Sequence, residues 1–216
     1  MNKIYVVAIG IVVMVSACNM KQENRDNLKV ASPDKQLTIS FYLDEVGAPG
    51  YFASFNDKTV VDSSSLGFEL MDGRSLATGF NMINSSTRSD DKTWEQPWGE
   101  EREIRDHYNE LKIDLETEEG LKMNLYFRAY DGGLGFRYEF PEQENLDEFE
   151  VAEELTEFNM GGNHQAWWIP AFAGNRYEYI YEKSPINDLK TVHTPLTLET
   201  DDSLYISIHE AALKDF

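Results

Sequence analysis

Hydrophobic and polar residues alternate along much of the chain beyond residue 28. The clearest series has apolar side chains at every second position in Leu111–Leu115, Leu121–Phe127 and Leu134–Phe140. The short sequences Glu119-Gly120 and Asp131-Gly132-Gly133 separate these three segments. A period of two places the apolar side chains on one face of a strand, and short glycine-containing turns join antiparallel neighbours. The series therefore predicts an antiparallel meander in which each strand buries one face.

The same alternation recurs on both sides of this meander. It predicts further strands and one more hairpin, in Leu37–Leu43, Tyr51–Phe55, Leu66–Leu70, and Leu196–Thr200 with Leu204–Ile208. No long segment shows the 3.6-residue period of an amphipathic helix, and strands do not alternate with helices. We therefore predict an all-β fold, an antiparallel β-sandwich. The polar, serine-rich segment Asn81–Lys92 lacks the pattern and is predicted to be a loop.

The N-terminus has the features of a bacterial lipoprotein signal peptide. A short positive start precedes an apolar run, Ile4–Val15, which is well below the roughly 20 residues that span a bilayer as a helix. The run leads into Val15-Ser16-Ala17-Cys18, which resembles a lipobox with Cys18 as the lipidated residue. An ordinary signal peptide with a chance cysteine is the alternative. We predict a signal peptide at 1–18, a polar tether at 19–27 and a folded domain at 28–216.

Charge restricts the class of partner. The formal net charge is −20, and a polyanion would be repelled by it, so no nucleic-acid partner is expected. A neutral sugar or a divalent cation remains compatible with this charge. Most of the carboxylates are expected to form a solvated surface. With a single cysteine, the chain forms no intrachain disulfide.

Recognised catalytic motifs are missing from the sequence. The chain contains no GxSxG, HExxH, P-loop or CxxC sequence, and its four histidines are scattered. Aromatic side chains are a feature of sugar sites because a pyranose ring presents an apolar C–H face to them. The candidates of this kind are Trp94, Trp98, Trp167 and Trp168.

The stretch from Trp94 to Leu111 combines tryptophan, histidine, arginine and glutamate side chains, as a catalytic site would. Its last part leads directly into the alternating segment that begins at Leu111, which ties the stretch to the sandwich. Salt bridges of Arg102 and Arg105 with nearby glutamates or with a neighbouring domain would suit an interface. We therefore predict a domain-docking or pocket-wall role for this stretch, and no proton transfer.

The order of several motifs resembles the N-terminal domain of glycoside hydrolase family 97, a family of bacterial α-glucosidases and α-galactosidases. The resemblance runs from about Leu28 to the last residue. The motifs that carry it are Ser32-Pro33-Asp34, Gly47-Ala48-Pro49, Ser65-Leu66-Gly67, Trp94-x-x-Pro97-Trp98-Gly99-Glu100, Ile104-Arg105-x-x-Tyr108-Asn109-Glu110-Leu111, Asp131 to Pro141, Thr156-Glu157-Phe158, Trp168-x-Pro170, Tyr177-Glu178-x-x-Tyr181 and His209 to Leu213.

The resemblance implies a galactose-mutarotase-like β-supersandwich that is incomplete at its C-terminal end. It also implies that the catalytic (β/α)8 barrel is absent from this chain, which is then a fragment or truncated relative without activity alone. The expected function is that of a carbohydrate-associated domain that packs against the barrel and completes its active site. An autonomous, cell-surface carbohydrate-binding lipoprotein is the alternative. A sugar epimerase rests on the fold analogy alone.

The resemblance also implies site residues and partners. Glu178 matches a family glutamate that reaches a calcium ion shared with the barrel, so binding of calcium by this chain alone is expected to be weak or absent. Trp167 and Trp168 are the predicted carbohydrate-binding residues. The expected partners are the barrel, an α-linked oligosaccharide and, through Cys18, a membrane. The expected location is the cell envelope, as an outer-membrane lipoprotein facing the periplasm or the surface.

Overall fold

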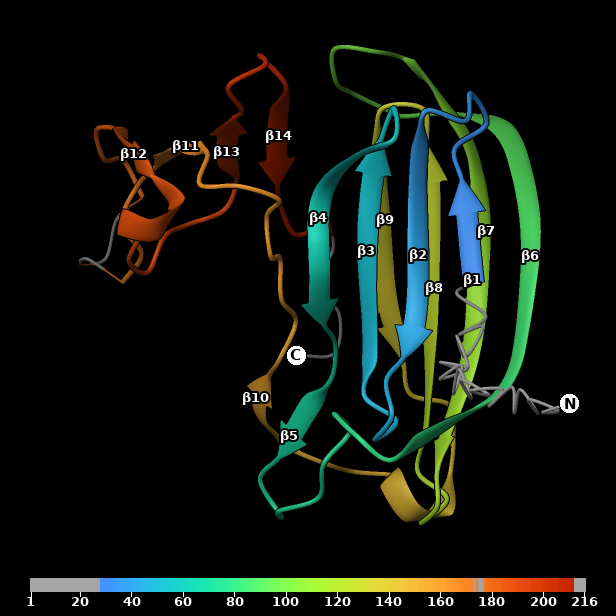
Figure 1. The fold of residues 1–216 in the computed structure, drawn as a ribbon. Coiled ribbons are helices and arrows are strands. Elements are labelled where there is room, and N and C mark those ends of the chain that lie inside the picture. The colour runs from blue at the N-terminus through green and yellow to red at the C-terminus, as the bar shows by residue number, and fades with distance from the viewer. Residues whose placement is uncertain (1–27, 173, 175–176, 212–216) are drawn as a thin grey trace, which may run out of the picture.

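The chain folds into two four-stranded antiparallel sheets that pack face to face, with a smaller sheet beside them (Figure 1). This computed structural model describes residues 28–172, 174 and 177–211. The first sheet contains β1 (Leu28–Ala31), β2 (Leu37–Leu43), β3 (Pro49–Phe55) and β4 (Lys58–Ser65). The second sheet contains β6 (Phe80–Glu95), β7 (Glu103–Thr117), β8 (Lys122–Tyr130) and β9 (Gly133–Glu139). The predicted meander is thus confirmed as β7, β8 and β9.

Alternation along the strands builds the core between the two sheets. Ile39 and Phe41 of β2 face the layer formed by Leu111 and Ile113 of β7 and by Leu125 of β8, and all five side chains are buried. Because the side-chain period of a strand is two, the residues between them point to the outer faces, where most are polar. The all-β, antiparallel fold predicted from this pattern is confirmed.

An aromatic cluster occupies the centre of the core. The ring of Phe127 lies 6.2 Å from that of Phe41, 6.0 Å from that of Tyr51 and 5.9 Å from that of Phe136, centroid to centroid. These tilted contacts join the two sheets, since Phe41 and Tyr51 come from the first sheet and Phe127 and Phe136 from the second. The tilted arrangement avoids the unfavourable face-to-face alignment of aromatic quadrupoles.

The prediction of a loop at Asn81–Lys92 was wrong, because this segment forms most of β6. Its backbone pairs with β7 along its whole length, from Phe80 opposite Thr117 to Glu95 opposite Glu103. The side chains are nevertheless mostly exposed, since β6 is the outermost strand of its sheet. The polar composition of this segment reflects an edge strand with little burial on either face. Such a strand has no alternation of apolar and polar residues by which the sequence could identify it.

The small sheet has the strand order β12-β11-β13-β14 and stands to one side of the sandwich in Figure 1. Its strands are β11 (Gln165–Trp168), β12 (Glu182–Pro185), β13 (Leu196–Glu199) and β14 (Tyr205–Ile208), so the predicted C-terminal hairpin is confirmed. A bridge between Val61 and Met160 and a 2.5 Å ion pair between Lys58 and Asp202 connect this region with β4.

The remaining elements are short. β5 (Phe68–Leu70) pairs with β10 (Val151–Glu154), and two 3₁₀ turns lie at η1 (Glu144–Leu146) and η2 (Ile186–Asp188). Within the described part of the chain, none of the helical segments has the length and apolar character needed to cross a bilayer. The predicted signal peptide, Cys18 and the tether lie outside the described residues.

Candidate functional site

The predicted site residues that the structure describes all belong to the small sheet or to the segment beside it. Trp167 and Trp168 are adjacent in β11, and Glu178 follows in the connection from β11 to β12. Adjacent residues of a strand point to opposite faces of its sheet. The two tryptophans are therefore placed in different environments.

Trp168 belongs to the hydrophobic core of the small sheet. Its side chain is 6% exposed and packs with Ala166 and Leu198. The indole N–H donates a hydrogen bond to Ser184 Oγ on β12 at 3.0 Å, which satisfies the one polar group of the ring. In this position Trp168 anchors β11 and offers little ring surface to a ligand.

Trp167 lies on the opposite, solvent-facing side of the same strand and is 39% exposed. The ammonium of Lys183 on β12 lies 4.6 Å from its ring centroid. Lys183 Nζ also forms a 2.6 Å ion pair with Glu199 on β13, and the Tyr205 hydroxyl of β14 donates to the other oxygen of Glu199 at 3.3 Å. Four neighbouring strands thus bring together four side chains, which we call the Trp167 cluster: Trp167, Lys183, Glu199 and Tyr205.

Glu199 is ionised in this cluster. The hydrogen bond from Lys183 holds the pKa of the Glu199 carboxyl below its usual value, although desolvation opposes this effect. The sequence had suggested Trp167, but not Lys183, Glu199 or Tyr205. The predicted hairpin of Leu196–Thr200 and Leu204–Ile208 contains Glu199 and Tyr205, and the structure supplies the register that pairs them. The pairing of β11 with β12 and β13 depends on contacts distant in sequence.

Glu178 is exposed and is surrounded in sequence by large side chains that are also exposed. Ile180 is 90% exposed, and Phe172, Tyr177 and Tyr181 are exposed as well. Tyr177 is held at its hydroxyl, which donates to the Thr194 carbonyl oxygen, and its ring lies 4.8 Å from that of His193. We call the four apolar residues around Glu178 the apolar segment. Such a concentration of exposed apolar side chains is typical of an interaction surface.

The described residues do not form a calcium site by themselves. Among residues 28–172, 174 and 177–211, no three aspartate, glutamate, histidine or cysteine side chains come close enough together to hold a metal ion. A calcium ion takes six to eight oxygen ligands, and Glu178 supplies one carboxylate. Any calcium site that includes Glu178 needs its other ligands from elsewhere.

The stretch from Trp94 to Leu111 forms the end of the β6–β7 hairpin, and its loop arches over one end of the sandwich (Figure 1). Trp98 in this loop is 85% exposed. Both of its arginines form ion pairs with β6: Arg102, just before β7, with Glu95 at 3.0 Å, and Arg105 of β7 with Asp91 at 2.7 Å. These contacts fix the two arginines to β6 and hold the hairpin together.

Glu110 forms a buried charge cluster that the sequence did not reveal. It is 3% exposed on the outer side of the second sheet, where one carboxylate oxygen accepts from Arg88 Nε at 2.5 Å and the other from Arg128 Nε at 2.7 Å. The Arg128 guanidinium also lies 4.2 Å from the Tyr108 ring centroid. Burial alone would raise the pKa of Glu110, but the hydrogen bonds from the two arginines outweigh it and lower the pKa. Both oxygens are occupied, so the cluster stabilises the sheet and is not available as a base.

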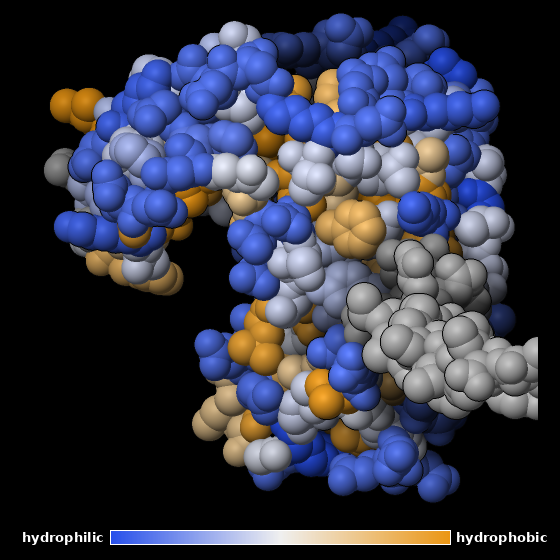
Figure 2. Space-filling view, viewed as in Figure 1, coloured by the Kyte–Doolittle hydropathy of each residue, from blue (hydrophilic) through white to orange (hydrophobic). Residues whose placement is uncertain are grey.

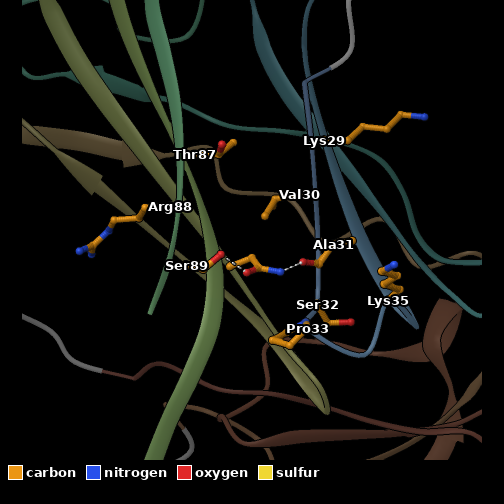
Figure 3. A pocket seen from close by; sticks show the side chains of 10 residues that line it. Lys29, Val30, Ala31, Ser32, Pro33, Lys35, Thr87, Arg88 and Ser89 are labelled. Carbon is orange, nitrogen blue, oxygen red and sulfur yellow. Dashed lines mark hydrogen bonds between the residues drawn. The ribbon is translucent and has the colours of Figure 1, made fainter. Parts of the chain in front are cut away.

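A groove of about 530 Å³ runs between β1 and β6 (Figure 3). Asn109 crosses its floor, donating to the Ala31 carbonyl oxygen at 2.8 Å and accepting from Ser89 Oγ at 2.5 Å. Arg88 also lines the groove, but its guanidinium is bound to Glu110. The groove contains none of the predicted site residues.

The shape of the molecule leaves a recess beside the small sheet. In Figure 2 the small sheet and its connections project from the upper part of the sandwich, and an open space separates them from the lower part. The wall of this recess carries both polar and apolar patches in that view. A recess of this kind provides concave surface against which another domain could pack.

Comparison with known proteins gives one consistent result. Residues 30–216 match the family described as glycosyl-hydrolase 97 N-terminal. A glycoside hydrolase family 97 enzyme from Pseudoalteromonas sp. strain K8, solved with panose and with acarbose, is 40% identical, with a TM-score of 0.83 over 88% of this chain and 29% of that enzyme. The retaining alpha-galactosidase of Bacteroides thetaiotaomicron is 20% identical over 92% of this chain and 31% of its own length.

A β-arabinopyranosidase structure shares the fold with a TM-score of 0.78 at 24% identity, over 86% of this chain and 32% of that one. The chain spans about 30% of the length of these relatives. The resemblance and the fold class predicted from the sequence are confirmed.

Proposed function

Because the chain belongs to the glycosyl-hydrolase 97 N-terminal family, we propose that it packs against the (β/α)8 barrel of a family 97 α-glycosidase and completes its active site. The family match carries this proposal, since it covers residues 30–216 of this chain while the relatives are about three times longer. The recess and the exposed apolar segment support it, because both offer surface to a second domain.

In this proposal the barrel supplies the catalytic groups, and this chain alone does not hydrolyse glycosides. Glycoside hydrolysis needs two carboxyl groups held at a defined separation across the scissile bond. The buried Glu110 carboxylate is bound by two arginines and is not free for such a role. The substrate class we propose is α-linked oligosaccharides, supported by the panose and acarbose complexes of the Pseudoalteromonas enzyme.

We further propose that Glu178 contributes one carboxylate to a calcium ion held mainly by the barrel. Its exposure and its position within the apolar segment support this role, because docking of that segment would carry Glu178 into the interface. Calcium prefers carboxylate oxygens, and a composite site would link metal binding to domain association.

We also propose lipidation at Cys18, which would anchor the protein in the cell envelope as an outer-membrane lipoprotein.

A chimaera tests this function. Residues 28–216 would replace the corresponding region of the Pseudoalteromonas enzyme, to which this chain is 40% identical. We expect the chimaera to hydrolyse an aryl α-glucoside and the chain alone to show no turnover. Glu178→Gln in the chimaera is expected to weaken calcium binding about tenfold or more, because it removes one charged ligand. Calcium titration of activity and calorimetry both measure this change.

The matched control is Glu182→Gln, an exposed glutamate at the start of β12. It should leave calcium binding and turnover unchanged. Turnover by the chain alone would refute its inactivity, and equal calcium affinity of the Glu178→Gln and unsubstituted chimaeras would remove Glu178 from the metal site.

A second candidate function is autonomous carbohydrate binding at the cell surface. The exposed indole of Trp167 favours it, because this ring remains accessible on the solvent face of the small sheet. The two functions are compatible, since a domain that completes an active site can also hold a more distant part of the same oligosaccharide.

A further inference from the structure

The Trp167 cluster is assembled by strand register on the outer face of the small sheet. Trp167 lies opposite Lys183 of β12, and Glu199 of β13 lies opposite Tyr205 of β14. Because β11 lies between β12 and β13, the 2.6 Å ion pair of Lys183 and Glu199 spans β11 beside Trp167. The small sheet stands to one side of the sandwich (Figure 1), and the side chains of Trp167 and Tyr205 on this face are 39% and 62% exposed.

The chemistry of the cluster suits a neutral polyhydroxylated ligand. An indole ring and a phenol ring offer flat apolar faces that can pack against the C–H face of a pyranose. The ammonium donates and the carboxylate accepts strong hydrogen bonds, so a vicinal pair of sugar hydroxyls can bind both. The two charges compensate each other, so the cluster presents no net charge to select an ion.

We propose that Trp167, Lys183, Glu199 and Tyr205 form a binding surface for an α-linked oligosaccharide, separate from the residues around Glu178. The choice of α-linked sugar rests on the proposed function, whereas the choice of a neutral sugar rests on the chemistry of the cluster. One sugar ring packs against the part of the Trp167 indole that the Lys183 ammonium leaves exposed. Lys183 and Glu199 bind the sugar hydroxyls, and Tyr205 holds the Glu199 carboxylate. Trp168 anchors the strand from below through its hydrogen bond to Ser184.

The charged groups of Lys183 and Glu199 are partly exposed and can therefore contact a ligand. The side chains of Lys183 and Glu199 are 39% and 30% exposed, so each retains surface for a ligand while their ion pair fixes their positions. A pre-organised pair loses less rotamer freedom on binding than two free side chains would. The simpler explanation is a cross-strand ion pair that stabilises a solvated face, and direct binding measurements separate the two.

Calorimetry of the full chain with maltotriose and maltoheptaose tests the proposal. We expect saturable binding that Trp167→Ala weakens about tenfold, as loss of an aromatic stacking contact would. Glu199→Gln should also weaken binding severalfold without altering the shape of the side chain, and Trp167→Phe should retain most of it. Trp98→Ala is the matched control, since Trp98 is more exposed than Trp167 but lies in the β6–β7 loop.

Each outcome bears on the proposal. Absence of heat with the unsubstituted chain, unchanged affinity of Trp167→Ala and Glu199→Gln, or an equal loss in Trp98→Ala would overturn it. Thermal unfolding of every variant identifies general destabilisation, and Glu199→Gln carries the test if Trp167→Ala proves unfolded. Activity of the chimaera depends on barrel docking and not on this surface. Failure of oligosaccharide binding and failure of the proposed function can therefore be distinguished.

Discussion

Phe127→Ala is expected to lower the free energy of unfolding by about 4 kcal/mol, within the range for truncating a fully buried phenylalanine. Phe127 is completely buried, and its ring touches aromatic rings from both sheets. Truncation would remove the stacking contacts and leave a cavity at the point where the sheets meet. Urea denaturation followed by circular dichroism measures the change as a shift in the midpoint at constant slope.

Phe158→Ala provides the comparison, because Phe158 is partly exposed at the edge of the same aromatic group, 6.0 Å from the Phe136 ring. We expect a loss of about 1 kcal/mol there, since less apolar surface leaves contact with protein. Equal losses in the two variants would contradict a core centred on Phe127. A Phe127→Leu substitution should recover much of the stability by filling part of the cavity.

The sequence predicts the parts of this fold in which burial follows a regular period. β8 and β9 were predicted because one face of each strand lies in the core and the other in water. β6 was missed because its side chains are mostly exposed, so they show no alternation of apolar and polar residues. Its backbone pairing with β7 cannot be read from the order of apolar residues. Edge strands are specified by their partners, so their own composition is a poor guide.

The sequence pattern also predicts only part of the candidate site. Alternation implies that Trp167 and Trp168 point to opposite faces, but it does not tell which face is buried. The core formed with Ala166 and Leu198 decides that Trp168 is inside. The other members of the Trp167 cluster are distant in sequence, and Tyr205 is 38 residues from Trp167. They come together because β12 pairs with β11 and β14 pairs with β13. Register between distant strands is set by the folded sheet as a whole.

The role of Glu110 depends on its position in the strand and on the strands that pair with it. In the sequence it occupies a polar position in an alternating strand and resembles any solvated glutamate. In the sheet it lies between Arg88 of β6 and Arg128 of β8, its register partners on either side. The missed strand β6 therefore explains the missed charge cluster, since one of the two arginines belongs to it.

Glu110→Gln is expected to destabilise the domain by about 3 kcal/mol at pH 7, because removing one partner of a buried ion pair leaves the opposite charges uncompensated. We place the effect at the lower end of the usual range, since Arg88 and Arg128 are partly exposed and water can solvate them. Urea denaturation measures it, with Glu103→Gln as the control. Glu103 is an exposed residue of the same strand and should show a change close to zero.

The pH dependence gives this prediction a second, independent test. The folded pKa of Glu110 is lowered below its unfolded value, so its contribution to stability is fully present above the unfolded pKa of about 4.3. The contribution is lost as pH falls through the folded pKa, where the carboxylate becomes protonated in the native state too. The stability difference between the unsubstituted chain and Glu110→Gln should therefore be largest near neutral pH and shrink below about pH 4. A difference that stays constant with pH would mean that glutamine disturbs the packing around Tyr108 and that charge compensation by the two arginines contributes little.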